Sequence, residues 1–133
     1  MSTRRKVIVV IDDDPGMLKA VQRVLTAKGY DTATFPSAEA FLECSTRHEV
    51  ACFVLDIHLA GMSGIELRRQ LAASGCTAPV IFMTAFDDEA TRDAAMGAGC
   101  IAYLHKPFLA HLLIDAIERS YSRRFQPARP PGR

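Results

Sequence analysis

Several features are scarce in this sequence of 133 residues, and each absence narrows what the protein does. No apolar run approaches the length of a bilayer span, and the opening residues lead into a short Val/Ile run rather than a small-residue cleavage site. We therefore expect no membrane partner and a cytoplasmic location. The formal net charge is only +1, from 16 Lys and Arg against 15 Asp and Glu, so we expect this domain itself to bind no nucleic acid.

Cysteines are few and widely spaced, with no Cys-x-x-Cys pair. They are Cys44, Cys52, Cys76 and Cys100, and their apolar or small neighbours predict reduced, largely buried thiols. A zinc site that uses His48 and Cys52 fits by spacing alone. Cys52 falls in a predicted buried strand, however, and no second ligand pair accompanies it, so the structural interpretation is favoured.

The composition is that of one compact globular domain with a real core. Hydrophobic residues make up 49% of the chain and charged residues 23%, and the length leaves no room for a second full domain. We place that domain at residues 1–124. The segment 125–133 is rich in proline and glycine, which predicts a disordered tail or an interdomain linker.

Strand and helix patterns alternate strictly along the domain. Four apolar runs predict buried strands, and a weakly alternating fifth predicts a more exposed one; in chain order the runs are Lys6 to Ile11, Tyr30 to Phe35 (the exposed one), Ala51 to Leu55, Val80 to Met83, and Ile101 to Leu104. Helices are predicted from Pro15 to Gly29, Ala38 to about Cys44, Ile65 to about Ser74, about Glu89 to Gly97, and Leu109 to Tyr121. Such alternation specifies an α/β fold with a doubly wound parallel sheet and helices on both faces.

Chemically active side chains stand at or just after the ends of these strands. Asp12 and Asp13 follow the first, Asp56 the third, Thr84 the fourth and Lys106 the fifth. Since the carboxyl ends of parallel strands share one edge, we expect these groups to converge there. Three neighbouring carboxylates repel one another, so the pKa of at least one should be raised unless a cation is bound. An oxygen-rich cluster of this kind suits Mg²⁺ together with a phosphoryl group.

Taken together, these motifs resemble the receiver domain of two-component response regulators. The resemblance covers about Lys6 to Arg119 and rests on the acid pair, Val54-Leu-Asp56 with Met62-Ser-Gly64, Met83-Thr-Ala85, and Lys106-Pro-Phe108. It implies a flavodoxin-like (βα)₅ fold with strand order 2-1-3-4-5. Ser-Ala-Glu-Ala-Phe-Leu and Met-Ser-Gly-Ile-Glu-Leu are similar to receivers of transcriptional regulators of the nitrogen-fixation and LuxR-output type.

The resemblance also implies a role for each site residue. Asp56 would be the phosphoacceptor that attacks the phosphohistidine of a sensor histidine kinase, a signalling role rather than that of an enzyme with turnover. Thr84 and Lys106 would each contact a phosphoryl oxygen, and the peptide bond before Pro107 would be cis. The Mg²⁺ or Mn²⁺ ligands would be Asp12, Asp13, Asp56 and the backbone carbonyl of His58.

A conformational switch follows from the same resemblance. Tyr103 matches the aromatic residue that turns inward when Thr84 moves toward the phosphoryl group. The surface formed by the fourth helix, fifth strand and fifth helix would then carry the output, through a partner, an attached domain or a homodimer. No helix-turn-helix follows the receiver, so we expect either a free-standing receiver or the first part of a longer regulator.

Three positions depart from the family pattern. Ala60 stands where a proline is frequent, which predicts a less rigid loop, while His58 and Phe86 occupy the two positions that tune hydrolysis of the phosphoryl group. Two other functions stay open. A phosphorylation-independent interaction domain would bind its partner regardless of Asp56, and a haloacid-dehalogenase-like phosphohydrolase would need a second acid at position 58.

Other polar residues have simpler interpretations. Asp14 is expected only to cap a helix, and Asp87 with Asp88 only to begin one, so none is placed in the site. The four histidines are expected to be exposed polar residues, because no pair of helices of the histidine-kinase kind surrounds them; they are His48, His58, His105 and His111.

Overall fold

A computed structural model describes residues 6–44 and 49–125. The strands are β1 (Lys6–Ile11), β2 (Thr32–Phe35), β3 (Glu49–Asp56), β4 (Val80–Thr84) and β5 (Ala102–His105). The helices are α1 (Pro15–Ala27), α2 (Ala38–Glu43), α3 (Gly64–Ala73), α4 (Glu89–Ala98) and α5 (Ala110–Phe125). Our expectations for residue 48 and for the tail from 126 to 133 lie outside the described residues.

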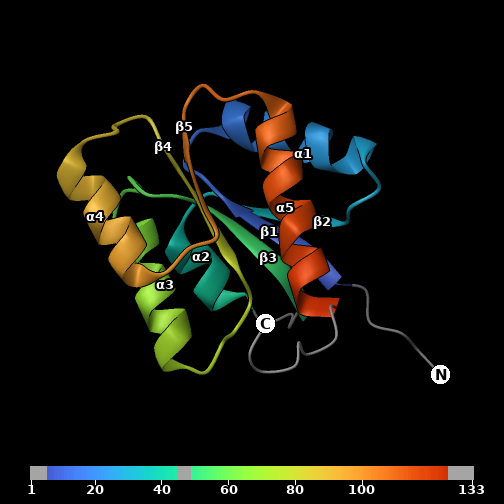
Figure 1. Cartoon of the computed structure of the whole chain (residues 1–133). Helices are drawn as coiled ribbons and strands as arrows, with labels where there is room; N and C mark the ends of the chain where they lie inside the picture. The colour runs from blue at the N-terminus through green and yellow to red at the C-terminus, as the bar shows by residue number, and fades with distance from the viewer. Residues whose placement is uncertain (1–5, 45–48, 126–133) are drawn as a thin grey trace, which may run out of the picture.

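The five strands form one parallel sheet in the order β2-β1-β3-β4-β5. Helices α1 and α5 cover one face, whereas α2, α3 and α4 cover the other (Figure 1). Both the predicted fold class and the predicted strand order are therefore confirmed. The chain order reverses direction between β1 and β3, which is where open sheets of this kind have a crevice at the carboxyl ends of their strands.

The absence of polar alternation in the central strand is explained by the two cores. In β3, Cys52 and Val54 point into the core beneath α1 and α5, while Phe53 and Leu55 point into the core beneath α2, α3 and α4. All four side chains are at most 1% exposed. Burying each large apolar side chain contributes about 1.5–3 kcal/mol to the free energy of folding, so both faces of β3 stabilise the sheet. This burial holds the strand in register and so fixes where it ends.

Some predicted boundaries were wrong. The second strand begins at Thr32 rather than Tyr30, because Gly29 adopts a φ of +88° and the Tyr30 amide donates to the Leu25 carbonyl at 3.0 Å. Tyr30 then stacks on Tyr121, with ring centroids 5.6 Å apart. The central strand is longer than predicted, since it runs from Glu49 to Asp56.

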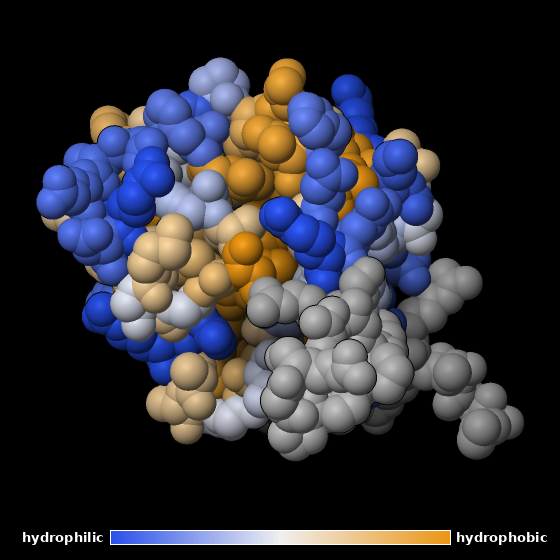
Figure 2. Space-filling view, viewed as in Figure 1, coloured by the Kyte–Doolittle hydropathy of each residue, from blue (hydrophilic) through white to orange (hydrophobic). Residues whose placement is uncertain are grey.

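Two burial predictions also need correction. Among the cysteines, which are all free thiols, only Cys52 is buried and the other three are half-buried. Leu109 and Leu112 belong to the apolar residues, spaced three and four apart, that predict the last helix as amphipathic, but they are 65% and 43% exposed. Figure 2 shows apolar surface over the start of α5 on this face of the molecule. None of the helices in the described ranges is long and apolar enough to cross a membrane.

Helix starts are fixed by side chains that accept backbone amides. Asp14 caps α1 and Asp88 caps α4, as predicted for helix starts outside the site. Ser37 caps α2 through the Ala40 amide, and Ser63 caps α3. Because α3 begins directly after the loop that follows Asp56, its cap also fixes the far end of that loop.

Candidate functional site

The carboxyl edge of the sheet brings the predicted residues together. Asp56 is the last residue of β3, Thr84 is the last of β4, and Asp12 directly follows β1. Parallel pairing places Ile11 beside Leu55 and aligns β3 with β4, so the three strand ends lie side by side.

Three carboxylates form the centre of the site. An oxygen of each of Asp12, Asp13 and Asp56 lies within 4.8 Å of the others. Asp12 and Asp56 are 0% and 5% exposed, whereas Asp13 is exposed to solvent. Carboxylate oxygens with one open, solvated side suit a hard divalent cation that keeps several waters, which is the behaviour of Mg²⁺. The cluster is therefore able to hold a metal ion.

Lys106 supplies the positive charge of the site. Its Nζ lies 2.7 Å from Asp12 Oδ2 and 3.5 Å from Asp56 Oδ2. The lysine comes from the loop between β5 and α5, and its bond to Pro107 is cis, as the family resemblance implied. The other oxygen of Asp12 accepts the Asp14 amide at 2.9 Å, so this buried carboxylate is held from two sides.

Burial and the neighbouring charges together set the pKa values of Asp56 and Lys106. Burial raises the pKa of Asp56, the charge of Asp12 raises it further, and Lys106 with the His58 amide lowers it; the net shift is upward. Burial lowers the pKa of Lys106, but its ion pairs with Asp12 and Asp56 outweigh burial and the net shift is upward. The expectation of one raised carboxyl pKa is therefore confirmed at Asp56.

Residues 57–63, which we call the β3–α3 loop, directly follow Asp56, and two amides of the loop contact carboxylates of the site. The His58 amide donates to Asp56 Oδ1 at 3.2 Å, and the Ala60 amide donates to Asp13 Oδ2 at 3.4 Å. Gly64 closes the loop, where an added Cβ would lie only 2.4 Å from the Asp56 carbonyl oxygen. Only glycine therefore fits at that position without moving the backbone.

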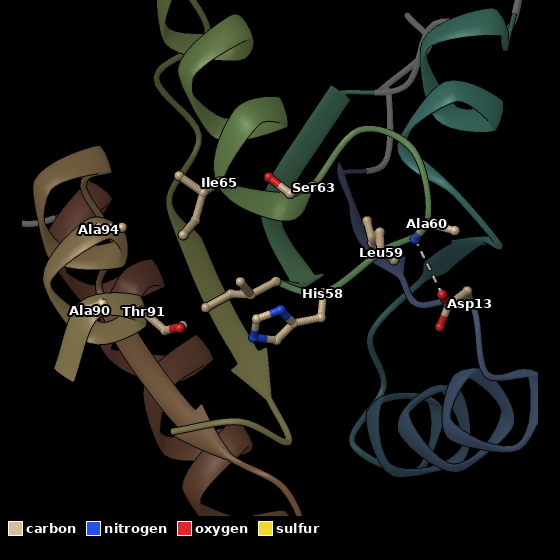
Figure 3. Close-up of a pocket in the computed structure, with 10 residues that line it drawn as sticks. Asp13, His58, Leu59, Ala60, Ser63, Ile65, Ala90, Thr91 and Ala94 are labelled. Atoms are coloured by element: carbon tan, nitrogen blue, oxygen red, sulfur yellow. Dashed lines mark hydrogen bonds between the residues drawn. The ribbon is translucent and has the colours of Figure 1, made fainter. Parts of the chain in front are cut away.

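A hollow of about 680 Å³ opens beside this loop. Figure 3 shows Leu59, Ala60 and Asp13 on one side and Ala90, Thr91 and Ala94 of α4 on the other, with the His58 ring between them. The dashed line in the same view joins Ala60 to Asp13. Of the metal-binding candidates, Asp13 and His58 line this hollow, whereas Asp12 and Asp56 do not.

The two switch candidates lie on neighbouring strands, because Thr84 is the last residue of β4 and Tyr103 lies within β5. Thr84 is fully buried, and its hydroxyl both donates to the Phe86 carbonyl at 3.0 Å and accepts the Phe86 amide at 2.9 Å. The Tyr103 hydroxyl is buried and makes no hydrogen bond with the described residues. Burial and the charge of Asp87 raise the pKa of Tyr103. Arg92 lies 5.1 Å above the Tyr103 ring.

Residues expected outside the site do lie outside it. Asp87 pairs with Arg92 at 2.8 Å, and Asp88 accepts the Thr91 amide. The rings of the three histidines within the described part of the chain are exposed; they are His58, His105 and His111. The ring of Phe86 meets that of His58 edge-on at 5.2 Å, so both tuning positions touch.

Sequence reasoning missed two features that hold the β3–α3 loop. Ser63 and Glu66 form a capping box, in which each side chain accepts the other residue's amide. Its Ser-x-x-Glu spacing was a readable signal. Glu39 accepts the Met62 amide at 2.8 Å, a contact between distant parts of the chain that no local pattern indicates.

Comparison with known proteins agrees with this geometry. Residues 8–118 match the family model described as the response regulator receiver domain. The response regulator protein TodT of Pseudomonas putida is 34% identical over 117 residues, which are 88% of this chain and 52% of TodT. Transcriptional regulatory protein FixJ of Bradyrhizobium diazoefficiens is 34% identical over 91% of this chain and 58% of its own length. The chain spans about half the length of these curated relatives.

Solved structures show the same fold. A crystal structure of FixJ-N superposes with a TM-score of 0.80 and 30% identity, covering 96% of this chain and all of that one. The BeF₃-activated DrrB receiver domain gives a TM-score of 0.81 with 29% identity over 90% of this chain and 99% of its own. A CheY-like receiver from Methanospirillum hungatei JF-1, at 23% identity and 0.83, supports the fold alone, over 90% of this chain and 96% of that one.

Proposed function

Because the chain belongs to the response regulator receiver family, whose members are signalling domains, we propose that Asp56 accepts a phosphoryl group from a histidine kinase. The observation that carries the proposal is the setting of this carboxylate. Asp56 ends the central strand, lies within 4.8 Å of two further carboxylates, and has the Lys106 ammonium 3.5 Å from its Oδ2. A nucleophile, a cation and a set of metal ligands therefore share one edge of the sheet.

In the proposed reaction, an Asp56 oxygen attacks phosphorus in line with the bond to the kinase histidine. The new O–P bond forms as the P–N bond breaks, and the released imidazole nitrogen takes a proton from solvent. Lys106 stabilises the negative charge of the phosphoryl oxygens as a point charge, while the Thr84 hydroxyl donates to another of them. Rate acceleration comes from positioning and charge, so the domain needs no acid or base of its own.

Asp12, Asp13, Asp56 and the His58 backbone carbonyl would hold Mg²⁺ or Mn²⁺. The donor set fits such an ion, because it is made of oxygens and one of its carboxylates faces solvent. When bound, the ion neutralises phosphoryl charge and the mutual repulsion of the acids.

Phosphorylation would then act as a switch. It adds a charge of about −1.5 to −2 to an already acidic edge, which favours a shift of the Thr84 hydroxyl away from Phe86 and toward the new oxygens. Tyr103 would move into the space that Thr84 leaves. Reversing a 99:1 preference between the two conformations takes about 5.5 kcal/mol, which a few charge-assisted hydrogen bonds are able to supply.

We propose in addition which surface passes the signal on. The surface formed by α4, β5 and α5 would change on phosphorylation and control a partner, an attached output domain or a homodimer. FixJ is a transcriptional regulatory protein, and the chain covers 58% of its length, so an attached output is a natural arrangement. The receiver domain would span residues 1–124, and 125–133 would be a tail or an interdomain linker whose first residue, Phe125, still belongs to α5. Receivers work with sensor histidine kinases, and we place the pair in the cytoplasm.

Chemical mapping of the modified residue tests the proposal. The protein is incubated with phosphoramidate and Mg²⁺, and then with borohydride, which reduces an aspartyl phosphate to homoserine. Peptide mass spectrometry should find homoserine at position 56. Homoserine at position 12 or 13, or none anywhere in a folded sample, would contradict the assignment of Asp56.

A further inference from the structure

Three alternate backbone amides of the β3–α3 loop each donate to a carboxylate from a different element. The pairs are His58 with Asp56 at 3.2 Å, Ala60 with Asp13 at 3.4 Å, and Met62 with Glu39 at 2.8 Å. The first two carboxylates belong to the cluster at the sheet edge. The third comes from the first turn of α2, outside that cluster, and its hydrogen bond is the shortest of the three.

The contact between Glu39 and the loop is close along the backbone. Gly61 has a φ of +76°, and a Cβ added there would lie 2.6 Å from Glu39 Oε2. The loop therefore turns directly against the carboxylate at Gly61 and Met62. The hydrogen bond from the Met62 amide lowers the pKa of Glu39, so this side chain is an ionised acceptor at neutral pH.

Besides Glu39, the side chains of Ile57 and Leu59 restrain the first half of the loop, because both are buried in the core beneath α2, α3 and α4. The first residues of the loop are tied to the sheet, and its last is fixed by the capping box of α3. Ala60, at the exposed centre, does not restrict φ as a proline would. The bond of Ala60 to Asp13 is long, at 3.4 Å, and its acceptor belongs to the carboxylate cluster at the sheet edge. Glu39 lies outside that cluster, and its bond to the Met62 amide is shorter, at 2.8 Å.

We propose that Glu39 is a positioning residue for phosphoryl transfer, whose carboxylate holds the β3–α3 loop in place beside Asp56 through the Met62 amide. This role rests on the proposed function of Asp56. Loss of the acceptor frees the loop, and the His58 backbone beside Asp56 then samples more than one position. Reacting groups that lose alignment react more slowly, even where donor binding is unchanged.

Three variants test this role. Glu39→Ala removes the acceptor, Glu39→Gln keeps a carbonyl oxygen that accepts the Met62 amide without the charge, and Glu43→Ala removes an exposed acid from the same helix. Amide exchange of Met62 by NMR reports the contact, and intact mass reports the rate of phosphorylation by phosphoramidate with Mg²⁺. Urea unfolding checks that each variant is folded, as the exposure of Glu39 leads us to expect.

In Glu39→Ala we expect Met62 exchange to quicken about tenfold and the limiting phosphorylation rate to fall about three- to tenfold, with the half-saturating donor concentration unchanged. Glu39→Gln should stay within about twofold of the wild type, and Glu43→Ala should match it.

A wild-type rate in Glu39→Ala despite fast Met62 exchange would overturn the role, as would unchanged exchange. A Glu39→Gln variant as slow as Glu39→Ala would assign the effect to charge and also overturn it. If the wild type itself accepts no phosphoryl group, the proposed function fails and the role in transfer fails with it. Met62 exchange still shows in that case whether Glu39 holds the loop.

Discussion

At the scale of single residues, the site holds three carboxylates and one ammonium group, so negative charge exceeds positive charge there. Asp12 and Asp56 are both buried at the sheet edge, and Lys106 contacts both, but more closely Asp12, at 2.7 Å rather than 3.5 Å. Asp56 is therefore the less compensated of the two, which agrees with its raised pKa. A cation that binds next to Asp56 should therefore stabilise the ionised form of this carboxylate.

Asp56→Asn should stabilise the protein in the absence of divalent cations, by about 1 kcal/mol at pH 7. Because the pKa of Asp56 is raised in the folded state by burial and by Asp12, its ionised form opposes folding at neutral pH. That cost is absent below the unfolded pKa of about 3.9 and grows as the pH rises through the folded-state pKa. Urea unfolding of both proteins in EDTA, from pH 4 to pH 8, measures the difference.

Asp13→Asn is the matched control. Its carboxylate is exposed and solvated, so the same change should alter stability less. If Asp56→Asn is no more stable than the wild type at pH 7, or if its advantage does not shrink toward pH 4, the description of Asp56 as an uncompensated buried charge is incorrect.

Phe86→Glu should shorten the lifetime of the phosphorylated protein. The Phe86 ring is 64% exposed and lies against His58 beside the site, where it is able to shield the acyl phosphate but not to orient a water molecule. A carboxylate at the same position would hold and orient water for hydrolysis. Loss of the phosphorylated mass with time after removal of the donor measures both lifetimes, and an equal or longer lifetime in the variant would refute this assignment.

Much of the site is predictable from the sequence because the sequence shows where each buried strand ends. Apolar runs that stop at Asp12, Asp56 and Thr84 fix where each side chain emerges. The partner of a side chain is harder to predict. That the Thr84 hydroxyl bonds Phe86, and that Glu39 reaches Met62, depends on loop conformations set by tertiary contacts.

At the scale of elements, the start of α3 contributes most directly to the site. Ser63 and Glu66 satisfy each other's free amides, and Gly64 packs on the Asp56 backbone one residue later. A helix that begins in this way anchors the loop before it, so the capping box serves the active edge as well as the helix.

Ser63→Ala should lower the free energy of unfolding by about 1 kcal/mol, because the Glu66 amide loses its acceptor at the helix start. Ser74→Ala, at the exposed far end of the same helix, is the control and should change stability by less than about 0.5 kcal/mol. Urea denaturation measures both. Equal effects of the two substitutions would show that the capping box adds no particular stability.

Element types were predicted correctly, while several boundaries and faces were not. The Tyr30 segment has a β-like composition, but Gly29 and the Leu25 carbonyl draw it into the end of α1. The apolar spacing of the last helix includes Leu113 and Ile117, which are buried, but it also includes Leu109 and Leu112, which are exposed. Periodicity identifies an apolar stripe, but it does not say which residues of the stripe the tertiary packing covers.

At the scale of the whole molecule, cation binding and folding are linked. Mg²⁺ should stabilise the wild type by about 2.7 kcal/mol at a concentration 100 times its dissociation constant, because the unfolded chain does not assemble the three carboxylates. Thermal unfolding with Mg²⁺ and with EDTA measures the shift. Asp13→Asn removes one ligand and should lose most of it, while Glu43→Ala should keep it; a shift of the same size in both variants would place the ion elsewhere.

The overall fold was predictable because it depends on alternation rather than on detail. Five apolar runs separated by helical segments admit few arrangements, and the observed sheet has the order that the family resemblance implied. The output was not predictable to the same degree, since it depends on surfaces and partners beyond a single domain. The exposed apolar residues at the start of α5, Leu109 and Leu112, lie within the surface that we propose for the output.

Intact mass after incubation with a small phosphodonor, with and without Mg²⁺, tests the central claim most directly. The wild type should gain one phosphoryl group only when Mg²⁺ is present, and Asp56→Asn should gain none. A wild type that gains no mass under these conditions, or an Asp56→Asn variant that gains the same mass, would contradict the claim that Asp56 is a metal-dependent phosphoacceptor.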